Sequence, residues 1–411
     1  MKPSALLLLS LASALLLMTT SCSPAQPATG IWGAWLDSPG AELAFGLDLA
    51  QDADGWTAHL VNGVERIPVP TASWEGDELT LDIDHYDAVI TATLSGDGRS
   101  LDGEWVKRRG PDLWTRMGFH ARAGAAERAT FDENSGQGAA LAGRWKVQFE
   151  SDDQPAAAVF SLDDAGHLSG TFMTTTGDYR YLAGDLDGDD LTLSCFDGAH
   201  ALLFRMQLSD TGTLAGEFWS RESWHETFTA ERDGDFVMPD GFALTRFIES
   251  ADFASLSFPD LTGELRTLDD PAFAGKARVI QIFGSWCPNC HDASDLMADF
   301  SNIYGEQGLS ILGLAFEVTG DLERDAEQVR RYAARHGVTY PLLVAGLSDK
   351  DAASEALPFL DKVRSYPTTV FLHGDGRVRA VYQGFSGPAT GAEFQALRAA
   401  FSGIVEELLA E

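Results

Sequence analysis

Residues 30–232 alternate between apolar and polar side chains with a period of two. Phe204, Met206 and Leu208, for example, are separated by polar residues, and Asp/Gly turn signals follow many of these runs. Such alternation is typical of strands that bury one face. The pattern predicts antiparallel β modules that form small barrels or sandwiches, because sheets of this kind need only one face covered.

The same region repeats itself at an offset of 113 residues. Gly30-Ile31-Trp32 recurs as Gly143-Arg144-Trp145 (30 to 143), and Leu101-Asp102-Gly103-Glu104-Trp105 recurs as Leu214-Ala215-Gly216-Glu217-Phe218 (101 to 214). We therefore expect two copies of one β module, at residues 30–122 and 141–232. Four Trp residues are expected in the cores of these modules rather than around a ligand: Trp32, Trp105, Trp145 and Trp219.

After a linker at residues 233–252, apolar runs alternate with amphipathic segments. The pattern predicts strands at 278–283 and 309–316, helices at 288–304 and 321–336, a strand pair at 368–372 and 378–382, and a final helix at 394–409. An order of strand, helix, strand and helix is typical of an α/β domain with a mainly parallel sheet. We expect this domain to cover residues 253–411.

Trp286-Cys287-Pro288-Asn289-Cys290 stands where the first of these strands gives way to a helix. The unpaired N–H groups and the dipole at a helix N-terminus favour negative charge, so we expect a stabilised thiolate on Cys287. Cys290 lies one turn later on the same face and is placed to attack a mixed disulfide formed by Cys287. Pro288 suits the first helical turn, where its missing N–H costs no hydrogen bond. The sequence predicts a redox-active dithiol that closes to a Cys287–Cys290 disulfide.

Four segments give this part of the chain a specific resemblance. They are Phe258-Pro259-Asp260-Leu261-Thr262-Gly263-Glu264, Phe283-Gly284-Ser285-Trp286-Cys287-Pro288-Asn289-Cys290, the strand ending at Glu317, and Ser365-Tyr366-Pro367-Thr368-Thr369-Val370-Phe371-Leu372. Together they resemble the thioredoxin fold and, within it, the TlpA/ResA-like family of membrane-anchored extracytoplasmic thiol–disulfide oxidoreductases. The resemblance implies a thioredoxin-like domain that exchanges disulfides with protein thiols.

The resemblance also assigns roles around the dithiol. Pro367 takes the place of the family's cis-proline, with Tyr340-Pro341 as the rival position, and a cis turn exposes backbone groups that can pair with a peptide. Glu317 stands where the family carries an acid near the dithiol, and a buried carboxylate there can move the proton of Cys290. The residues expected to meet the substrate are Trp286, Pro288, Tyr366 and Pro367.

Reduction is the direction that the resemblance favours, although the residues alone do not fix it. The expected partners are protein disulfides, with apocytochrome c as one candidate, and a membrane electron donor that restores the dithiol. The exchange itself calls for no cofactor and no metal.

Other readings of the same residues remain open. Cys287-Pro288-Asn289-Cys290-His291 also spells the attachment signature of c-type haem. We favour the dithiol, because the motif lies within a thioredoxin-like order of elements in which His291 is expected on the helix surface. A zinc site would need two ligands beyond this Cys pair. Cys195 is expected to be a small buried residue of a strand.

A second function class concerns the β modules. They are candidates for binding an envelope ligand or partner, with the redox domain as an accessory.

The N-terminus has the pattern of a secretory signal. Lys2 precedes an apolar run at residues 5–18, which is shorter than the roughly 20 residues needed to span a bilayer. Thr19, Thr20 and Ser21 then lead into Cys22, which resembles the lipobox of bacterial lipoproteins, although Thr19 departs from the usual Leu. We expect removal of residues 1–21, lipidation of Cys22, a linker at residues 22–29, and a protein anchored to the bacterial cell envelope facing the periplasm.

The net charge of the chain argues against one class of partner. The chain carries 62 Asp and Glu against 29 Lys and Arg, a formal net charge of −33. Nucleic-acid binding draws its affinity from cationic side chains that neutralise phosphates, so this chain is a poor nucleic-acid binder.

Overall fold

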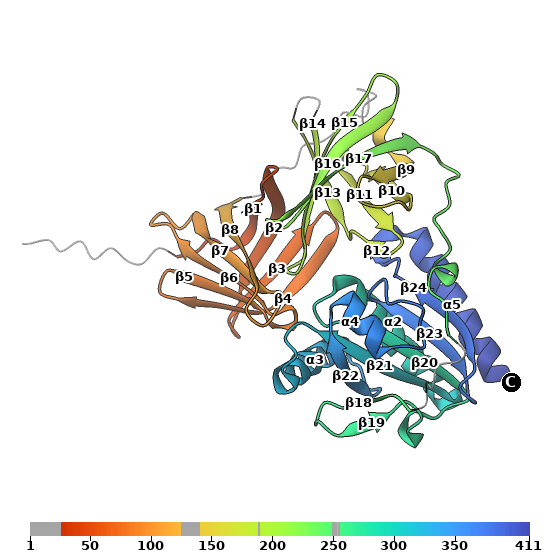
Figure 1. Cartoon of the computed structure of the whole chain (residues 1–411). Coiled ribbons are helices and arrows are strands. Elements are labelled where there is room, and N and C mark those ends of the chain that lie inside the picture. The colour runs from red at the N-terminus through yellow and green to blue at the C-terminus, as the bar shows by residue number, and fades with distance from the viewer. Residues whose placement is uncertain (1–25, 125–139, 188–189, 249–252, 254) are drawn as a thin grey trace, which may run out of the picture.

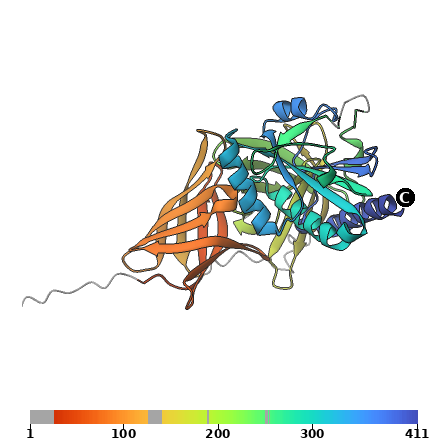
Figure 2. The same ribbon diagram turned by 90° about the horizontal axis from the view of Figure 1, so that it is seen from below.

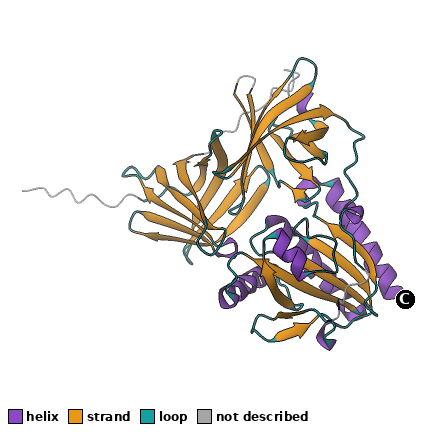
Figure 3. Ribbon diagram, viewed as in Figure 1, coloured by secondary structure: helices purple, strands orange, loops and turns teal. Residues whose placement is uncertain are grey.

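The computed structural model describes residues 26–124, 140–187, 190–248, 253 and 255–411, so the predicted signal sequence and Cys22 lie outside the described residues. Two β-barrels and a C-terminal α/β domain make up the molecule, and the α/β domain lies against both barrels (Figure 1). The α-helices α2 to α5 all belong to the C-terminal domain (Figure 3). Within the described ranges, no helix is both long enough and apolar enough to cross a membrane.

The first barrel follows chain order, and antiparallel pairing of β1 with β8 closes it. Its strands are β1 (Gly30–Asp37), β2 (Glu42–Gln51), β3 (Trp56–Asn62), β4 (Glu65–Glu75), β5 (Glu78–Ile83), β6 (Ala88–Leu94), β7 (Ser100–Arg108) and β8 (Trp114–Ala123). Alternate side chains fill its interior: in β3, Ala58, Leu60 and Asn62 are buried and their neighbours are not. A 3₁₀ turn, η1 (Asp84–Tyr86), joins β5 to β6.

The second barrel has the ring order β9-β10-β11-β13-β14-β15-β16-β17, and short β12 pairs with β11. Its strands are β9 (Gly143–Phe149), β10 (Ala156–Leu162), β11 (Leu168–Thr174), β12 (Gly177–Asp178), β13 (Leu182–Asp187), β14 (Asp190–Phe196), β15 (Ala201–Leu208), β16 (Thr213–Ser220) and β17 (Trp224–Arg232).

The sequence repeat appears as a repeated contact in the two barrels. The indole N–H of Trp32 donates to the Ala28 carbonyl at 3.0 Å, and that of Trp145 donates to the Leu141 carbonyl at 2.9 Å. The prediction of two β modules is confirmed, and closure decides in favour of barrels over sandwiches. All four Trp residues singled out by the sequence are buried.

The two barrels share part of their packing. Asn62 of β3 exchanges two hydrogen bonds, both 3.0 Å, with the backbone of Phe196 in β14. The Phe196 ring lies 4.7 Å from that of Phe45 and 5.1 Å from that of Trp105, within the core of the first barrel. A side chain of one barrel thus completes the core of the other, which fixes their relative position.

The C-terminal domain has a five-stranded sheet in the order β22-β21-β20-β23-β24. Its strands are β20 (Ala277–Phe283), β21 (Leu309–Glu317), β22 (Leu342–Leu347), β23 (Thr368–His373) and β24 (Val378–Gln383), and a separate pair is formed by β18 (Ser257–Pro259) and β19 (Leu265–Thr267). The helices are α2 (Pro288–Tyr304), α3 (Leu322–His336), α4 (Lys350–Ala356) and α5 (Ala392–Ala410).

Every element predicted for this domain is present, with small differences at the ends. The expected mainly parallel sheet is wrong, because only the β20–β21 and β21–β22 pairings are parallel. β23 pairs antiparallel with β20, and β24 pairs antiparallel with β23, so the sheet is mixed.

Arg180, in the loop between β12 and β13, links all three parts of the molecule. Its guanidinium lies 2.7 Å from Asp292 of α2, 2.5 Å from Glu65 of the first barrel and 3.5 Å from Asp197 of the second barrel. Burial raises the pKa of Asp292 to about 7, against the opposing charge of Arg180. Burial would also raise the pKa of Asp197, but His200 and Arg180 hold it below its usual range. One cation is thus shared by three largely buried carboxylates, one from each part of the molecule.

Further ion pairs hold the C-terminal domain against the barrels. Arg324 of α3 pairs with Asp87 beside η1, and Arg144 of β9 pairs with Glu393 of α5. Figure 2 shows α3 running along the first barrel. Both barrels therefore contact the α/β domain, the first barrel at α3 and the second at α5.

We expect Arg180→Met to lower the free energy of unfolding by about 3–5 kcal/mol, because buried carboxylates would lose their counter-charge. The measurement is urea denaturation at neutral pH. Arg116→Met is the matched control: it removes an exposed pair with Glu104 and should cost no more than about 1 kcal/mol. Equal losses in the two variants would contradict the structural role of Arg180.

Candidate active site

The central strand of the sheet positions the dithiol. β20 ends at Phe283, and a short turn leads into α2, whose N-cap is Cys287 and whose first residue is Pro288. The Cys287 sulfur accepts the backbone N–H of Cys290 at 3.3 Å. Gly284 is required in this turn, because a Cβ there would lie 2.9 Å from the Phe316 carbonyl oxygen of β21. The strand-to-helix placement inferred from the sequence is the one the structure shows.

The two thiols contact each other in a nearly closed environment. Their sulfur atoms lie 2.7 Å apart, Cys287 has 7% of its surface exposed, and Cys290 has none. Burial raises the pKa of Cys290 well above its usual value, and the hydrogen bond to Cys287 adds to the shift. Cys287 is therefore the more accessible sulfur, and Cys290 is the buried partner that keeps its proton.

The loop before β23 lies beside the dithiol. The Tyr366–Pro367 peptide bond is cis, and the Tyr366 carbonyl oxygen lies 3.5 Å from the Cys287 sulfur. The Tyr366 ring meets that of Trp286 edge to face at 5.5 Å. Four predicted substrate-facing residues, Trp286, Pro288, Tyr366 and Pro367, thus surround Cys287, although all but Trp286 are buried.

Glu317 lies at the end of β21 and is almost fully buried. Its carboxylate accepts the backbone N–H of Ser285 at 2.9 Å and the Ser285 hydroxyl at 2.6 Å. Burial raises its pKa to about 8, against these two hydrogen bonds. Its negative charge also contributes to the raised pKa of Cys290. Glu317 therefore lies close enough to act electrostatically on the dithiol, and Ser285 holds its orientation.

The expectation that His291 lies on the helix surface is wrong. His291 is buried, with one ring nitrogen 2.7 Å from the Ser285 carbonyl oxygen and the other 2.6 Å from a ring nitrogen of His336. Its ring also lies 4.5 Å from that of Tyr86 in the first barrel. Burial, followed by the neighbouring His336, lowers the pKa of His291 well below its usual value. Both nitrogens have protein partners, which leaves neither available as an axial haem ligand in this arrangement.

The barrels cover the dithiol from two sides, a feature without any local sequence signal. Asn289, between the two cysteines, packs so closely on Gly177 that a Cβ there would lie 1.7 Å from its amide nitrogen. Lys107 of β7 reaches from the first barrel to the Trp286 carbonyl oxygen at 3.4 Å. Burial lowers the pKa of Lys107 to about 8. Residues far away in the sequence thus complete the surroundings of Cys287.

Other chemistry-bearing groups lie elsewhere. Cys195 is fully buried in β14 of the second barrel, as its strand pattern predicted. Across the described parts of the chain, no group of three or more His, Cys, Asp and Glu side chains is arranged to hold a metal ion.

Comparison with known proteins agrees with this geometry. Residues 248–397 match the Redoxin family. The chain is 26% identical over 125 residues to thiol-disulfide oxidoreductase ResA of Geobacillus kaustophilus, and 27% identical over 129 residues to ResA of Halalkalibacterium halodurans. Each match covers 30% of this chain and 63% or 62% of the relative, so the chain spans less than two thirds of the length of these proteins.

Two solved structures are also similar to the C-terminal part. A thioredoxin family thiol:disulfide interchange protein from Chlorobium tepidum is 20% identical, with 39% of this chain and 99% of that chain covered and a TM-score of 0.29. A secreted disulfide oxidoreductase of Mycobacterium tuberculosis is 17% identical, with 38% and 99% covered and a TM-score of 0.28. The family match and the observed sheet, helix and dithiol agree: residues 248–397 match the Redoxin family, and the residues among them that the structure describes have a thioredoxin-like fold. We call this part of the chain, which follows the two β-barrels, the Redoxin domain.

Proposed function

We propose that this protein is a thiol–disulfide oxidoreductase that reduces disulfides through Cys287 and Cys290. The observation that carries the proposal is the pair of contacting sulfurs at the N-terminus of α2, beside the cis-proline loop of a Redoxin domain. The more exposed sulfur meets the substrate and the buried one resolves the intermediate.

The reaction transfers two electrons from the dithiol to the substrate. The Cys287 thiolate attacks one sulfur of the substrate disulfide, whose S–S bond breaks, and the leaving thiolate takes up a proton. Cys290 then loses its proton and attacks the Cys287 sulfur, which releases the second substrate thiol and leaves a Cys287–Cys290 disulfide. A membrane electron donor that carries a dithiol returns two electrons and two protons to the pair.

Glu317 supplies the base for the second step. Cys290 is buried and holds its proton firmly, so its attack needs a nearby acceptor. Glu317, with a pKa of about 8, exchanges a proton near neutral pH. The backbone N–H and the hydroxyl of Ser285 hold the carboxylate beside the turn that precedes Cys287.

The proposed setting is the bacterial cell envelope. The apolar leader and the lipobox-like residues before Cys22 support export and a lipid anchor, with the protein facing the periplasm. Disulfides form readily in that compartment, which gives a reductase its substrates. Protein disulfides, including that of apocytochrome c, are the substrates that we propose for it.

We expect Cys287→Ser to abolish reduction of insulin disulfides, because the attacking sulfur is lost. Cys290→Ser should instead accumulate a mixed disulfide between Cys287 and the substrate, because nothing resolves it. Non-reducing electrophoresis and mass spectrometry of the trapped adduct measure both outcomes. Cys195→Ser is the matched control and should leave turnover unchanged. An adduct on Cys290 in the Cys287→Ser variant would reverse the assigned roles.

Replacing Glu317 by Gln should slow the resolving step more than the first attack. In the unmodified protein the rate of disulfide closure from the mixed disulfide should rise with pH up to about 8, as Glu317 loses its proton. Glu317→Gln should remove this inflection and leave the rate of initial adduct formation within a few-fold. Rapid-quench measurement of the two steps between pH 5 and 9 separates them. An unchanged pH profile would exclude Glu317 as the base.

The same carboxyl makes a prediction about stability. The pKa of Glu317 rises from 4.5 to about 8 on folding, so between these values the folded chain keeps a proton that the unfolded chain releases. Its contribution is fully present below pH 4.5 and declines as the pH rises towards 8, by at most about 1.4 kcal/mol per pH unit. As the pH rises across this window, the free energy of unfolding of Glu317→Gln, measured by urea denaturation, should therefore increase relative to that of the unmodified protein.

A further inference from the structure

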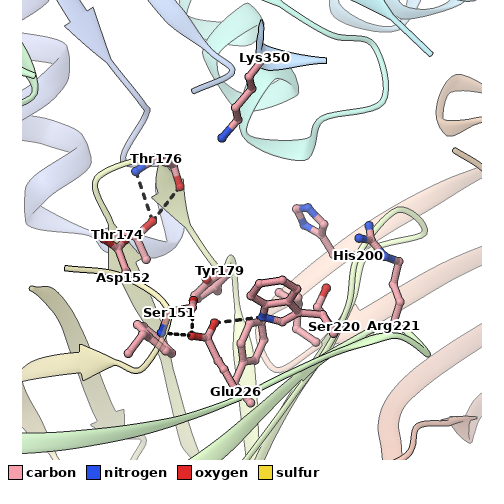
Figure 4. Close-up of a pocket in the computed structure, with 14 residues that line it drawn as sticks. Ser151, Asp152, Thr174, Thr176, Tyr179, His200, Ser220, Arg221, Glu226 and Lys350 are labelled. Carbon is pink, nitrogen blue, oxygen red and sulfur yellow. Dashed lines mark hydrogen bonds between the residues drawn. The ribbon is translucent and has the colours of Figure 1, made fainter. Parts of the chain in front are cut away.

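Two adjoining cavities lie between the second barrel and the dithiol. The larger, of about 470 Å³, lies at the second barrel and is bounded on the far side by Lys350 of α4, which faces His200 and Arg221 across the space (Figure 4). The smaller, of about 210 Å³, shares His200 and Arg221 with the first and reaches Trp286, the residue before Cys287. The two cavities thus meet at His200 and Arg221, and the hollow that they form together reaches the neighbour of Cys287.

The smaller cavity is lined by positively charged side chains, although the chain as a whole is acidic. Its lining includes Lys107, Arg108, Arg109 and Arg221 and contains no Asp or Glu, although acidic residues outnumber basic ones by 62 to 29 in the whole chain. Lys350 adds a further positive charge in the larger cavity, where Asp152 and Glu226 are the acidic lining residues. Positive charge is therefore concentrated at the end of the hollow that is nearest to Cys287.

Several of these cations lack an anionic partner. Arg108 pairs with Asp87 at 3.1 Å, but Lys107, Arg109, Arg221 and Lys350 form no ion pair with any residue that the structure describes. The Arg221 Nε atom is buried without a hydrogen bond. Burial, and next the positive charge of Arg109, lowers the pKa of Arg221. Glu222 offsets this repulsion only in part and forms no ion pair with Arg221. Two guanidinium groups that repel each other in this way form a site that an anion would stabilise.

The opposite side of the dithiol is closed by the chain itself. In the β11–β12 turn, the carbonyl oxygens of Thr175 and Thr176 accept hydrogen bonds from Gln383, at 3.0 Å, and from Ser365, at 2.9 Å. The same turn places Gly177 against Asn289. This turn therefore covers the cis-proline loop on one side. The cationic hollow reaches the dithiol from another side, and we expect a small molecule or an extended segment of a protein to enter there.

We propose that this cationic hollow binds carboxylate-bearing disulfides, with the carboxylates held by Arg109 and Arg221 and the S–S bond directed past Trp286 to Cys287. This inference rests on the proposed function and adds the chemical class of its substrate. Such a molecule is either a small disulfide with free carboxylates or an acidic cysteine-bearing segment of a protein. The exchange is the two-electron reaction given above, so it needs no further reactant.

Three disulfides of similar size test the proposal on the full, pre-reduced protein: 3,3′-dithiodipropionate, hydroxyethyl disulfide and cystamine, with charges of about −2, 0 and +2 at neutral pH. The measurement is the second-order rate constant for oxidation of the dithiol, followed by alkylation and mass spectrometry. Each rate is divided by that of dithiothreitol with the same disulfide, which removes intrinsic reactivity. We expect dithiodipropionate to be preferred over cystamine by at least about tenfold. The preference should shrink as salt is raised from 0.05 to 0.5 M.

Variants test whether the charge preference among the disulfides arises in the hollow. The double variant Arg109→Gln/Arg221→Gln should lose most of the charge preference, and Lys350→Gln on the rim should lose a smaller part. Arg377→Gln is the matched control, because Arg377 lies on the exposed β23–β24 hairpin and pairs with Asp375. It should keep the preference. Equal normalised rates for the three disulfides, or a preference that survives in the double variant, would overturn the inference.

A further pair of substrates tests whether the carboxylates belong to a small disulfide or to a protein segment. Cysteine peptides flanked by Asp or by Lys, each presented as a mixed disulfide, show whether an acidic protein segment reacts faster than dithiodipropionate; either order supports the carboxylate site and identifies its source. A faster reaction of the Lys-flanked peptide would refute the site. If no disulfide oxidises Cys287 and Cys290 at all, the proposed function fails as well, whereas uncharged hydroxyethyl disulfide reacting at a rate equal to the others refutes the inference alone.

Discussion

The guanidinium of Arg180 determines how the dithiol is enclosed. It lies where the two barrels and α2 meet. Its partners Glu65, Asp197 and Asp292 come from the first barrel, the second barrel and the helix whose N-cap is Cys287. Asp292 is two residues after Cys290, so an ion pair at this position fixes the first turn of α2 against both barrels. Joining domains through a shared cation requires accurate geometry. Each buried carboxylate costs desolvation energy, and only a correctly placed partner offsets that cost. The arrangement favours one docking geometry over many.

That docking geometry decides the electrostatics of the site. Lys107 reaches the Trp286 carbonyl only because the first barrel lies against the start of α2, and Arg221 enters the same hollow from the second barrel. A strongly acidic surface repels anions at long range, while a group of cations in a partly enclosed space attracts them at short range. The barrels therefore do more than hold the Redoxin domain, because they supply positive charges around its more exposed sulfur.

Much of the fold follows from sequence patterns, because those patterns reflect local physics. The period-two alternation marked the barrel strands, and the offset of 113 residues marked the two copies, since each copy must bury the same face. The dithiol was recognisable from spacing and position alone, since a helix N-terminus needs only neighbouring residues. Closure of each sheet into a barrel was not, because it depends on pairing between distant strands such as β1 and β8. The mixed sheet was missed for a related reason: the direction of β23 relative to β20 is set by tertiary packing.

The errors at the site have one physical origin. The sequence pattern around His291 predicts a surface residue. His336 of α3 contacts its ring, however, and Tyr86 and His85 of the first barrel cover it, so its burial depends on contacts between distant segments. Arg109, Arg221 and Lys350 carry no motif, and they matter only because three distant segments bring them to one hollow. Glu317 was found from the resemblance, yet its partner Ser285 became visible only in three dimensions. Chemistry at Cys287 is thus encoded locally, whereas access to Cys287 is encoded in contacts between domains. The family match is confined to residues 248–397, so it carries no information about the barrels. Under the proposed function, the choice among disulfide substrates must therefore be sought in the barrels.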